Sequence, residues 1–288
     1  MMETGERLVA TSVSGRPLAA TRMLFAAAAL VMLNSAWRRI GDGFDPDWVH
    51  IPWPVVQDHL VGFPPSVVIA LWGVGAVALF LGLVPRLAAA SVVLGMGSFY
   101  AVDQQHYANG GYFMVLVGTL LVLADSGASW TPWGPDRRRA SWWPTFLLAL
   151  QLSIVYLYAA VQKLRDPGLR GDTIDWQLNG PAMDHIAWSR LPEALNLLGG
   201  AGEVVVAIGL WFAVTRRPAL VVGIALHIGI LAFIRDSPDL LAFGLASFAL
   251  YPAFWLAAPP LAAVRHELRT SPPGSTEASD RPEPVGQA

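Results

Sequence analysis

Three ionisable side chains lie within or at the end of long apolar stretches of this sequence. Glu203 lies in the stretch 195–214, His227 in the stretch 219–234, and Lys163 follows the stretch 140–162. Ionisable groups are costly inside a bilayer and usually mark functional sites there. Because consecutive membrane spans run antiparallel, we expect Glu203 and His227 to reach similar depths, on facing sides of two helices and near the end that carries Lys163. The pattern predicts that both side chains lie within reach of a shared polar cavity.

Lys163 is the only lysine among the 19 basic residues of the chain. A lysine in a partly dry pocket can lose its proton and act as a base. Tyr156 and Ala160 precede it by seven and three positions, so all three share one face of a helix. A second reading stays open, in which Lys163 only anchors its helix at the interface and Glu203 pairs with an arginine or histidine to hold helices together.

The composition excludes most soluble and cysteine-dependent classes of protein. Hydrophobic residues make up 54% of the 288 residues and charged residues 14%, and the mean hydropathy is +0.47. The net charge of -2 offers no basic surface for nucleic acid. The chain has no cysteine, which excludes disulfides, thiolate nucleophiles and cysteine-bound metals, and no metal site is expected. The fold class predicted is all-α, a polytopic transmembrane helical bundle.

The apolar stretches give about eight membrane spans, since each span needs about 20 residues. The first could also be read as a signal peptide, but seven further stretches favour a span. A cytoplasmic segment 1–17 would precede a transmembrane domain 18–264, and a disordered cytoplasmic tail 265–288 would follow. The predicted spans are 18–37, 66–84, 87–102, 111–124, 140–162, 195–214, 219–234 and 240–264.

The distribution of arginine and lysine predicts that both termini are cytoplasmic. The chain is expected in the cell inner membrane or plasma membrane. Two long outer loops, 38–65 and 164–194, would then lie at the membrane interface, and they carry tryptophans and histidines that could also cover a site: Trp48, His50, Trp53, His59, Trp176, His185 and Trp188. The run from Gly199 to Gly202 lacks the context of a nucleotide-binding loop, and it predicts close packing of helices through small residues.

Several of these residues, in this order, resemble the HTTM domain, the membrane part of vitamin K-dependent gamma-carboxylases. The resemblance covers about residues 15–257. It rests on Arg22 in the first span, Asn109 before a span that begins with Tyr112 and Phe113, a run from Tyr156 and Tyr158 to Gln162, Lys163 and Leu164, then Leu169, Gly171, Glu203 and His227.

The resemblance implies a role for each of these residues. In that family a lysine at the position of Lys163 is taken as the base that deprotonates reduced vitamin K, whose oxidation drives the addition of carbon dioxide to a glutamate. Carried over, the catalytic residues would be Lys163, His227, Glu203 and His106, the last in place of a family histidine that is Gly110 here. The cofactor would be a reduced quinone, contacted by Tyr156, Asn109 and Arg22.

Two functions stay open at this point. One is a quinol-dependent enzyme, similar to a carboxylase or an oxidoreductase, that acts at the outer leaflet with Lys163 as base. The other is a non-enzymatic membrane partner in the maturation of, or immunity to, a secreted peptide. An enzyme needs Lys163, Glu203 and His227 to face one cavity, whereas a partner protein does not.

Overall fold

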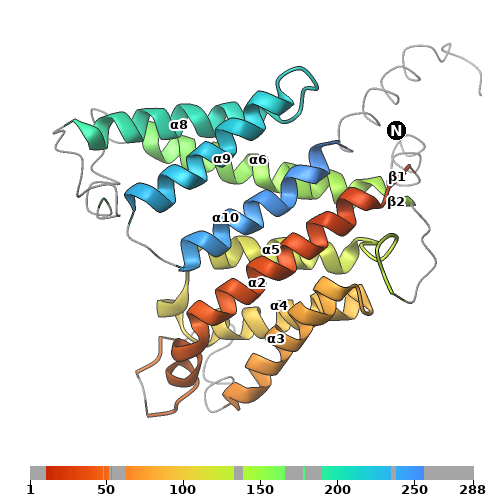
Figure 1. Cartoon of the computed structure of the whole chain (residues 1–288). Helices are drawn as coiled ribbons and strands as arrows, with labels where there is room; N and C mark the ends of the chain where they lie inside the picture. Colours follow the sequence, from red (N-terminus) through yellow and green to blue (C-terminus); the bar gives the residue numbers. More distant parts are fainter. Residues whose placement is uncertain are drawn as a thin grey trace, which may run out of the picture.

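The computed structural model describes residues 11–47, 49–51, 53, 63–132, 139–165, 178, 190–234 and 238–255. This part of the chain is almost entirely helical (Figure 1). Outside it lie Trp48, His59, Leu169, Gly171, Trp176, His185, Trp188 and the tail 265–288. The α-helices are α2 (Arg16–Gly43), α3 (Pro65–Leu81), α4 (Pro85–Val102), α5 (Asn109–Leu123), α6 (Trp142–Leu164), α8 (Leu191–Gly209), α9 (Arg216–Phe233) and α10 (Pro238–Leu250).

A helix lies at each predicted stretch, but the lengths differ. Five of the described helices, namely α2, α4, α6, α8 and α9, are long and apolar enough to cross a membrane. The other three apolar helices, α3, α5 and the one that runs from α10 into a 3₁₀ turn at Tyr251–Ala253, are shorter than that. The structure therefore supports a polytopic membrane protein with five candidate spans.

Two local features differ from the sequence prediction. The first helix continues to Gly43, past the predicted end at residue 37, so the first part of the expected outer loop is helical. The described part also contains a small antiparallel sheet, in which β1 (Ser12–Ser14) pairs with β2 (Arg139–Ser141). Strands this short carry no readable period-2 pattern, which is why sequence periodicity missed them.

Prolines and one glycine fix several helix boundaries. Pro65 and Pro85 begin α3 and α4, where a missing N–H costs nothing. Gly82 ends α3 in the left-handed conformation, with φ of 76°, which only glycine adopts freely. The turn between these helices is therefore tight and brings α3 and α4 together as an antiparallel pair.

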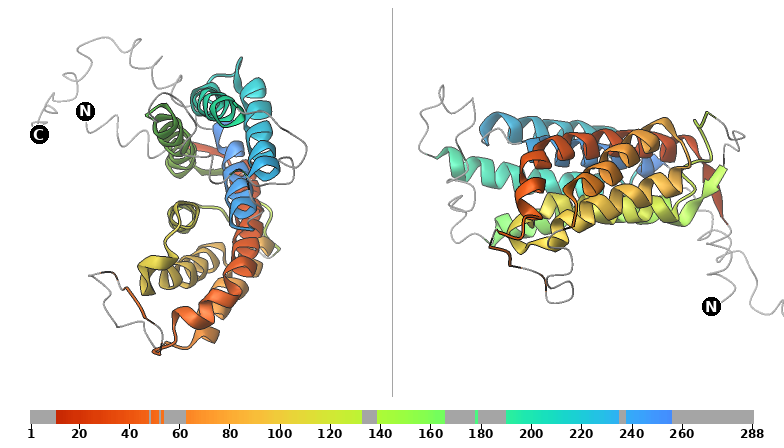
Figure 2. Two further views of the ribbon diagram at one scale, coloured as in Figure 1. Left: turned by 90° about the vertical axis from the view of Figure 1, so that its left-hand side faces the viewer. Right: turned by 90° about the horizontal axis from the view of Figure 1, so that it is seen from below.

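The helices form two groups joined by a central pair. The central pair is α2 and α10, which pack against each other. One group runs from α2 through α3 and α4 to α5, and the other consists of α6, α8 and α9 (Figure 2). The members of the two groups that face each other are α5 and α6.

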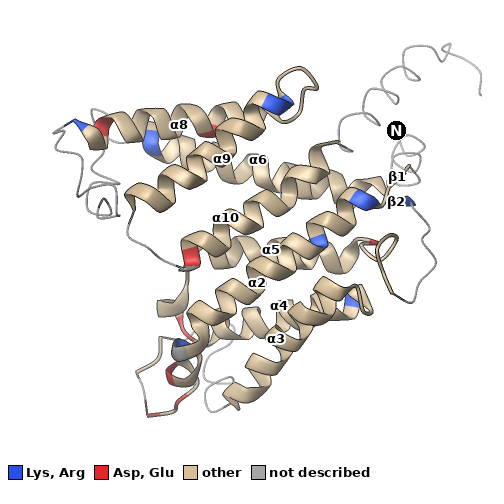
Figure 3. Cartoon of the chain, viewed as in Figure 1, with Lys and Arg blue, Asp and Glu red and all other residues tan. Residues whose placement is uncertain are grey.

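The two ends of the bundle are distinguished by the sheet and by Lys163. We call them the sheet end, where β1 and β2 pair, and the lysine end, where α6 finishes. The pairing of β1 with β2 brings residues 12–14 and 139–141 together at the sheet end. Most of the Lys, Arg, Asp and Glu residues in the described part lie toward the ends of the helices, and few lie along their middles (Figure 3).

Candidate functional site

The lone lysine forms a direct ion pair with the buried glutamate. Lys163 Nζ lies 2.6 Å from Glu203 Oε1, and the side chains are 23% and 9% exposed. Asn196 donates a hydrogen bond of 3.1 Å to the carbonyl oxygen of Lys163 at the end of α6. The second carboxylate oxygen, Glu203 Oε2, is buried without a hydrogen-bond partner among the described residues. Glu203 Oε2 is therefore available as a hydrogen-bond acceptor.

Glycines on α8 make room for the lysine. A Cβ atom on Gly199 would lie 3.4 Å from Lys163 Cε, and one on Gly200 would lie 3.5 Å from Lys163 Cβ. The aliphatic stem of Lys163 therefore rests on the glycine pair, which lets α6 and α8 approach closely. The predicted packing role of this glycine run agrees with these contacts.

The buried histidine belongs to a second polar cluster, formed with two tyrosines. Tyr156 OH lies 2.9 Å from His227 Nε2 and 2.9 Å from Tyr251 OH. All three side chains are 4% exposed. Gly223 leaves the space that this cluster needs, because a Cβ atom there would lie 2.1 Å from Tyr251 OH. These hydrogen bonds give each of the three buried polar side chains a partner, which it needs where water is scarce.

Glu203 and His227 are both buried, at 7% and 4% exposed. They do not share a partner, however, since Glu203 bonds to Lys163 and His227 bonds to Tyr156. Both partners project from one face of α6. Sequence spacing placed the two helices side by side, but only the tertiary contacts assign each side chain its own partner.

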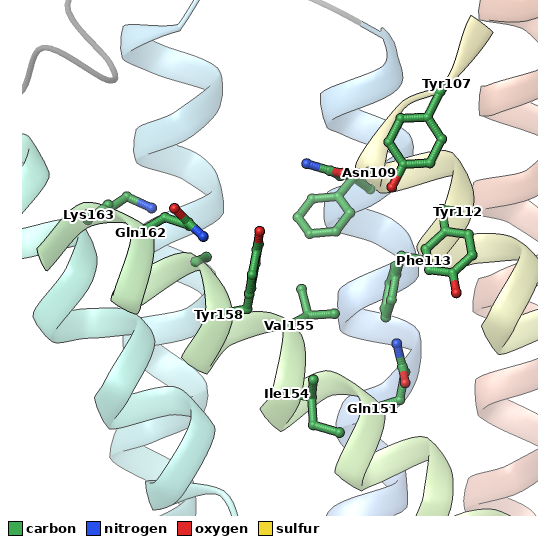
Figure 4. A pocket seen from close by; sticks show the side chains of 12 residues that line it. Tyr107, Asn109, Tyr112, Phe113, Gln151, Ile154, Val155, Tyr158, Gln162 and Lys163 are labelled. Atoms are coloured by element: carbon green, nitrogen blue, oxygen red, sulfur yellow. The ribbon is translucent and has the colours of Figure 1, made fainter. Parts of the chain in front are cut away.

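A pocket of about 700 Å³ lies between α5, α6 and α10. We call it the lateral pocket, and Figure 4 shows that Lys163 and Gln162 stand on its α6 side while Tyr107, Asn109 and Tyr112 stand across from them. Its lining combines aromatic rings, amides, one lysine and three aliphatic side chains. The aromatic residues are Tyr107, Tyr112, Phe113, Tyr158 and Phe243, the amides are Asn109, Gln151 and Gln162, the lysine is Lys163, and the aliphatic residues are Ile154, Val155 and Ala159.

The lateral pocket opens toward the surface of the bundle. Ile154, Tyr158 and Tyr112, which line it, are 51%, 62% and 53% exposed. The pocket is therefore open at the side of the bundle, between α5 and α6. Of the predicted site residues, Lys163 and Asn109 line the pocket; Glu203 reaches it through its bond to Lys163, and Tyr156 and His227 are not among its lining residues.

His106 lies in a different cavity at the lysine end. Its ring stacks on Phe99 with centroids 4.4 Å apart, and it packs closely against Gly43. With Arg39, His50 and Asp103 it lines a polar pocket of about 580 Å³. Burial lowers the pKa of His106 below its ordinary value of 6.5, against the opposing effects of the Phe99 carbonyl and of Asp103. The structure thus separates His106 from Lys163.

Gly110, where the resembling family has a histidine, borders the lateral pocket. A Cβ atom there would lie 3.4 Å from Phe243, one of the lining residues. A histidine at this position would therefore begin in ordinary contact with Phe243, whereas His106 lines a different pocket.

Arg22 lies near the opposite end of the bundle from Lys163. Its side chain is fully buried, and it donates hydrogen bonds of 2.7 Å to the carbonyl oxygens of Ser126 and Trp130. Gly82 packs against the same guanidinium group. Arg22 therefore ties α2 to the turn that follows α5, and the structure does not bring it together with the other candidate residues.

Sequence reasoning missed several residues of these sites. Tyr251 completes the cluster of Tyr156 and His227, and its signal was a tyrosine in the apolar stretch 240–264. Asn196 holds the end of α6, and a buried amide inside a span is the corresponding signal. Gln151 lines the lateral pocket from the middle of α6, where an uncharged polar residue attracts little notice in a sequence.

The comparison with protein families gives one match. The model of the HTTM domain matches residues 12–233, a range that includes Lys163, Glu203 and His227 and ends before Tyr251. No curated protein and no solved structure matches the chain. Together with the five helices of membrane length, the match identifies a multi-pass integral membrane protein.

Proposed function

We propose that this chain, which belongs to the HTTM domain family, is a membrane-embedded enzyme that removes a proton from a lipid-soluble quinol, with Lys163 as the base. The observation that carries the proposal is the position of Lys163. It stands in the wall of a pocket that opens toward lipid, and a buried carboxylate holds its amino group. The proposal also includes that the protein lies in a bacterial cell membrane with its lysine end on the outer side.

The lateral pocket suits a flat ring with oxygen substituents. Its volume of about 700 Å³ lies within the usual range for small-molecule sites. Tyr158 and Phe243 offer aromatic faces, and Asn109 and Gln162 offer amides that can donate to or accept from ring oxygens. A bound reduced quinone would supply an ionisable ring hydroxyl and two electrons for a later oxidation.

The ion pair can hold the proton that the base accepts. When Lys163 is neutral, its lone pair can receive a hydroxyl proton, and the ammonium group that forms is stabilised by Glu203 at 2.6 Å. When the pair carries a proton on Lys163, transfer of that proton to Glu203 leaves both groups neutral, and the free amine can then accept the hydroxyl proton. Glu203 thus positions Lys163 and regulates its protonation.

The proposal is tested with the purified full chain in lipid nanodiscs. A reduced menaquinone with a short isoprenoid tail serves as the probe, and oxygen consumption is measured for wild type, Lys163→Arg and Lys163→Ala. A guanidinium group cannot lose its proton in a protein, so we expect both variants to lose about 10²–10⁴-fold in rate, the usual contribution of a general base. Lys163→Arg should keep the folded yield of wild type.

Arg165→Ala is the matched control, because it removes a neighbouring positive charge just beyond α6 and should leave the rate unchanged. Full activity in Lys163→Arg contradicts the base role and leaves Lys163 as an interfacial anchor. If wild type neither binds nor oxidises the quinol, the second proposal takes precedence, a non-enzymatic partner of a secreted peptide or of another membrane protein.

A further inference from the structure

A second cavity lies on the other side of Lys163, between α8 and α9. Its volume is about 320 Å³, and we call it the apolar pocket. Lys163 contributes to its wall, and the other lining residues are aliphatic, aromatic or glycine. Leu195, Leu198, Val222, Leu226, Ile230 and Phe233 form most of the wall. The chemistry of this lining therefore selects hydrocarbon.

Missing side chains create this cavity. Gly199, Gly202 and Gly229 all line it. A Cβ atom on Gly229 would meet nothing within 4 Å, so the backbone there faces open space. Helices in membranes usually use glycine to pack closely, and Gly199 and Gly202 do so against Lys163 and Leu226. At Gly229 no neighbour takes up the room, which leaves it for a ligand.

The charge at the boundary of the cavity limits the head group of that ligand. Lys163 lines both the apolar pocket and the lateral pocket. Its ammonium charge is balanced by Glu203 at 2.6 Å, so the pair as a whole is neutral. A carboxylate or phosphate head group would meet Glu203 with the same sign of charge, whereas a hydroxyl or carbonyl group can bond to the pair without that cost.

We propose that the apolar pocket holds the aliphatic chain of an uncharged amphiphile whose polar head reaches Lys163 from the lateral pocket. The two cavities together then form one divided site, in which Lys163 marks the boundary between ring and chain. The identity of the head rests on the proposed function, and under it the occupant is the isoprenoid chain of the quinol. Affinity therefore depends on the chain as well as on the ring.

Gly229→Leu tests the proposal because it adds a side chain at the wall of the cavity, where a Cβ atom would meet nothing within 4 Å. Gly97→Leu is the matched control, since a Cβ atom on Gly97 of α4 also meets nothing within 4 Å and Gly97 lines neither pocket. Both variants gain the same helix propensity, so they differ in the cavity alone. Binding to the full chain in nanodiscs is measured for oxidised menaquinone with a short isoprenoid tail, for menadione, which has no tail, and for palmitate.

We expect Gly229→Leu to weaken menaquinone binding by about ten-fold or more, the factor that corresponds to losing the burial of about two methylene groups. Menadione binding should be equal in wild type, Gly229→Leu and Gly97→Leu, and palmitate should not displace menaquinone. Equal menaquinone affinity in wild type and Gly229→Leu overturns the chain site, and displacement by palmitate overturns the uncharged head.

Failure of this inference and failure of the proposed function give different results. If menadione and menaquinone bind wild type equally well and depend on Lys163, the base proposal stands and the apolar pocket has no part in binding. If neither quinone binds wild type, the proposed function fails, and the chain site fails with it.

Discussion

Breaking the pair of Lys163 and Glu203 should destabilise the fold by an amount that depends on which partner is removed. Removing one member of a buried ion pair costs about 3–5 kcal/mol when the other stays buried and charged. After Lys163→Met, the 9% exposed carboxylate of Glu203 has no partner. The carboxylate can avoid this cost by taking up a proton. For an ordinary glutamate, protonation requires a free energy of about 3.7 kcal/mol at pH 7 and about 1 kcal/mol at pH 5. The loss in Lys163→Met should therefore shrink as the pH falls.

Glu203→Met should cost less than Lys163→Met at pH 7. The side chain of Lys163 is 23% exposed, so its ammonium group keeps some contact with water or lipid head groups. The double variant Lys163→Met/Glu203→Met leaves no charge behind, and two methionines pack against the apolar surroundings. We expect it to be more stable than Lys163→Met, with a coupling free energy of at least about 2 kcal/mol.

The measurement is the free energy of unfolding in mixed micelles for wild type, the two single variants and the double variant, at pH 7 and pH 5. The four values form a double-mutant cycle, which isolates the interaction between the two side chains. If the loss in the double variant equals the sum of the single losses to within about 0.5 kcal/mol, the two residues do not act as a pair. A loss in Lys163→Met that is the same at both pH values would refute the argument about the unpaired carboxylate.

Three further predictions concern topology, packing and pH. Since native cysteines are absent, an impermeant reagent outside the cell should label Asp47→Cys, an exposed site at the lysine end, and should not label the exposed Ser14→Cys at the sheet end; the reverse pattern would invert the proposed orientation. Gly223→Ala should lower the free energy of unfolding by about 1–3 kcal/mol, because its Cβ would lie 2.1 Å from Tyr251 OH, and a thermal midpoint equal to wild type would show that the cluster can shift. Because burial lowers the pKa of His106, the unfolded chain binds its proton first, so stability should fall as the pH drops below 6.5; His106→Gln should remove that part of the pH dependence, and an unchanged profile would contradict it.

The sequence by itself determined the class of fold and the positions of the helices. Long apolar stretches cannot remain in water, and in lipid each backbone N–H and C=O must bond within its own segment, so helices follow from composition alone. Prolines such as Pro65 and Pro85 mark helix starts for a local reason, the missing N–H. The burial of Glu203 and His227 could also be predicted, since a lone charge or imidazole in an apolar stretch turns away from lipid.

Only the tertiary structure decided which of these residues meet. From the sequence, Glu203 could have paired with an arginine or with His227. Because α6 packs on the glycines of α8, Glu203 instead forms its ion pair with Lys163. Arg22 and His106, which the order of residues grouped with the site, lie at other cavities and contacts. Side-chain partners depend on how helices rotate and cross, and that geometry arises from many small packing contacts spread along the chain rather than from any local pattern.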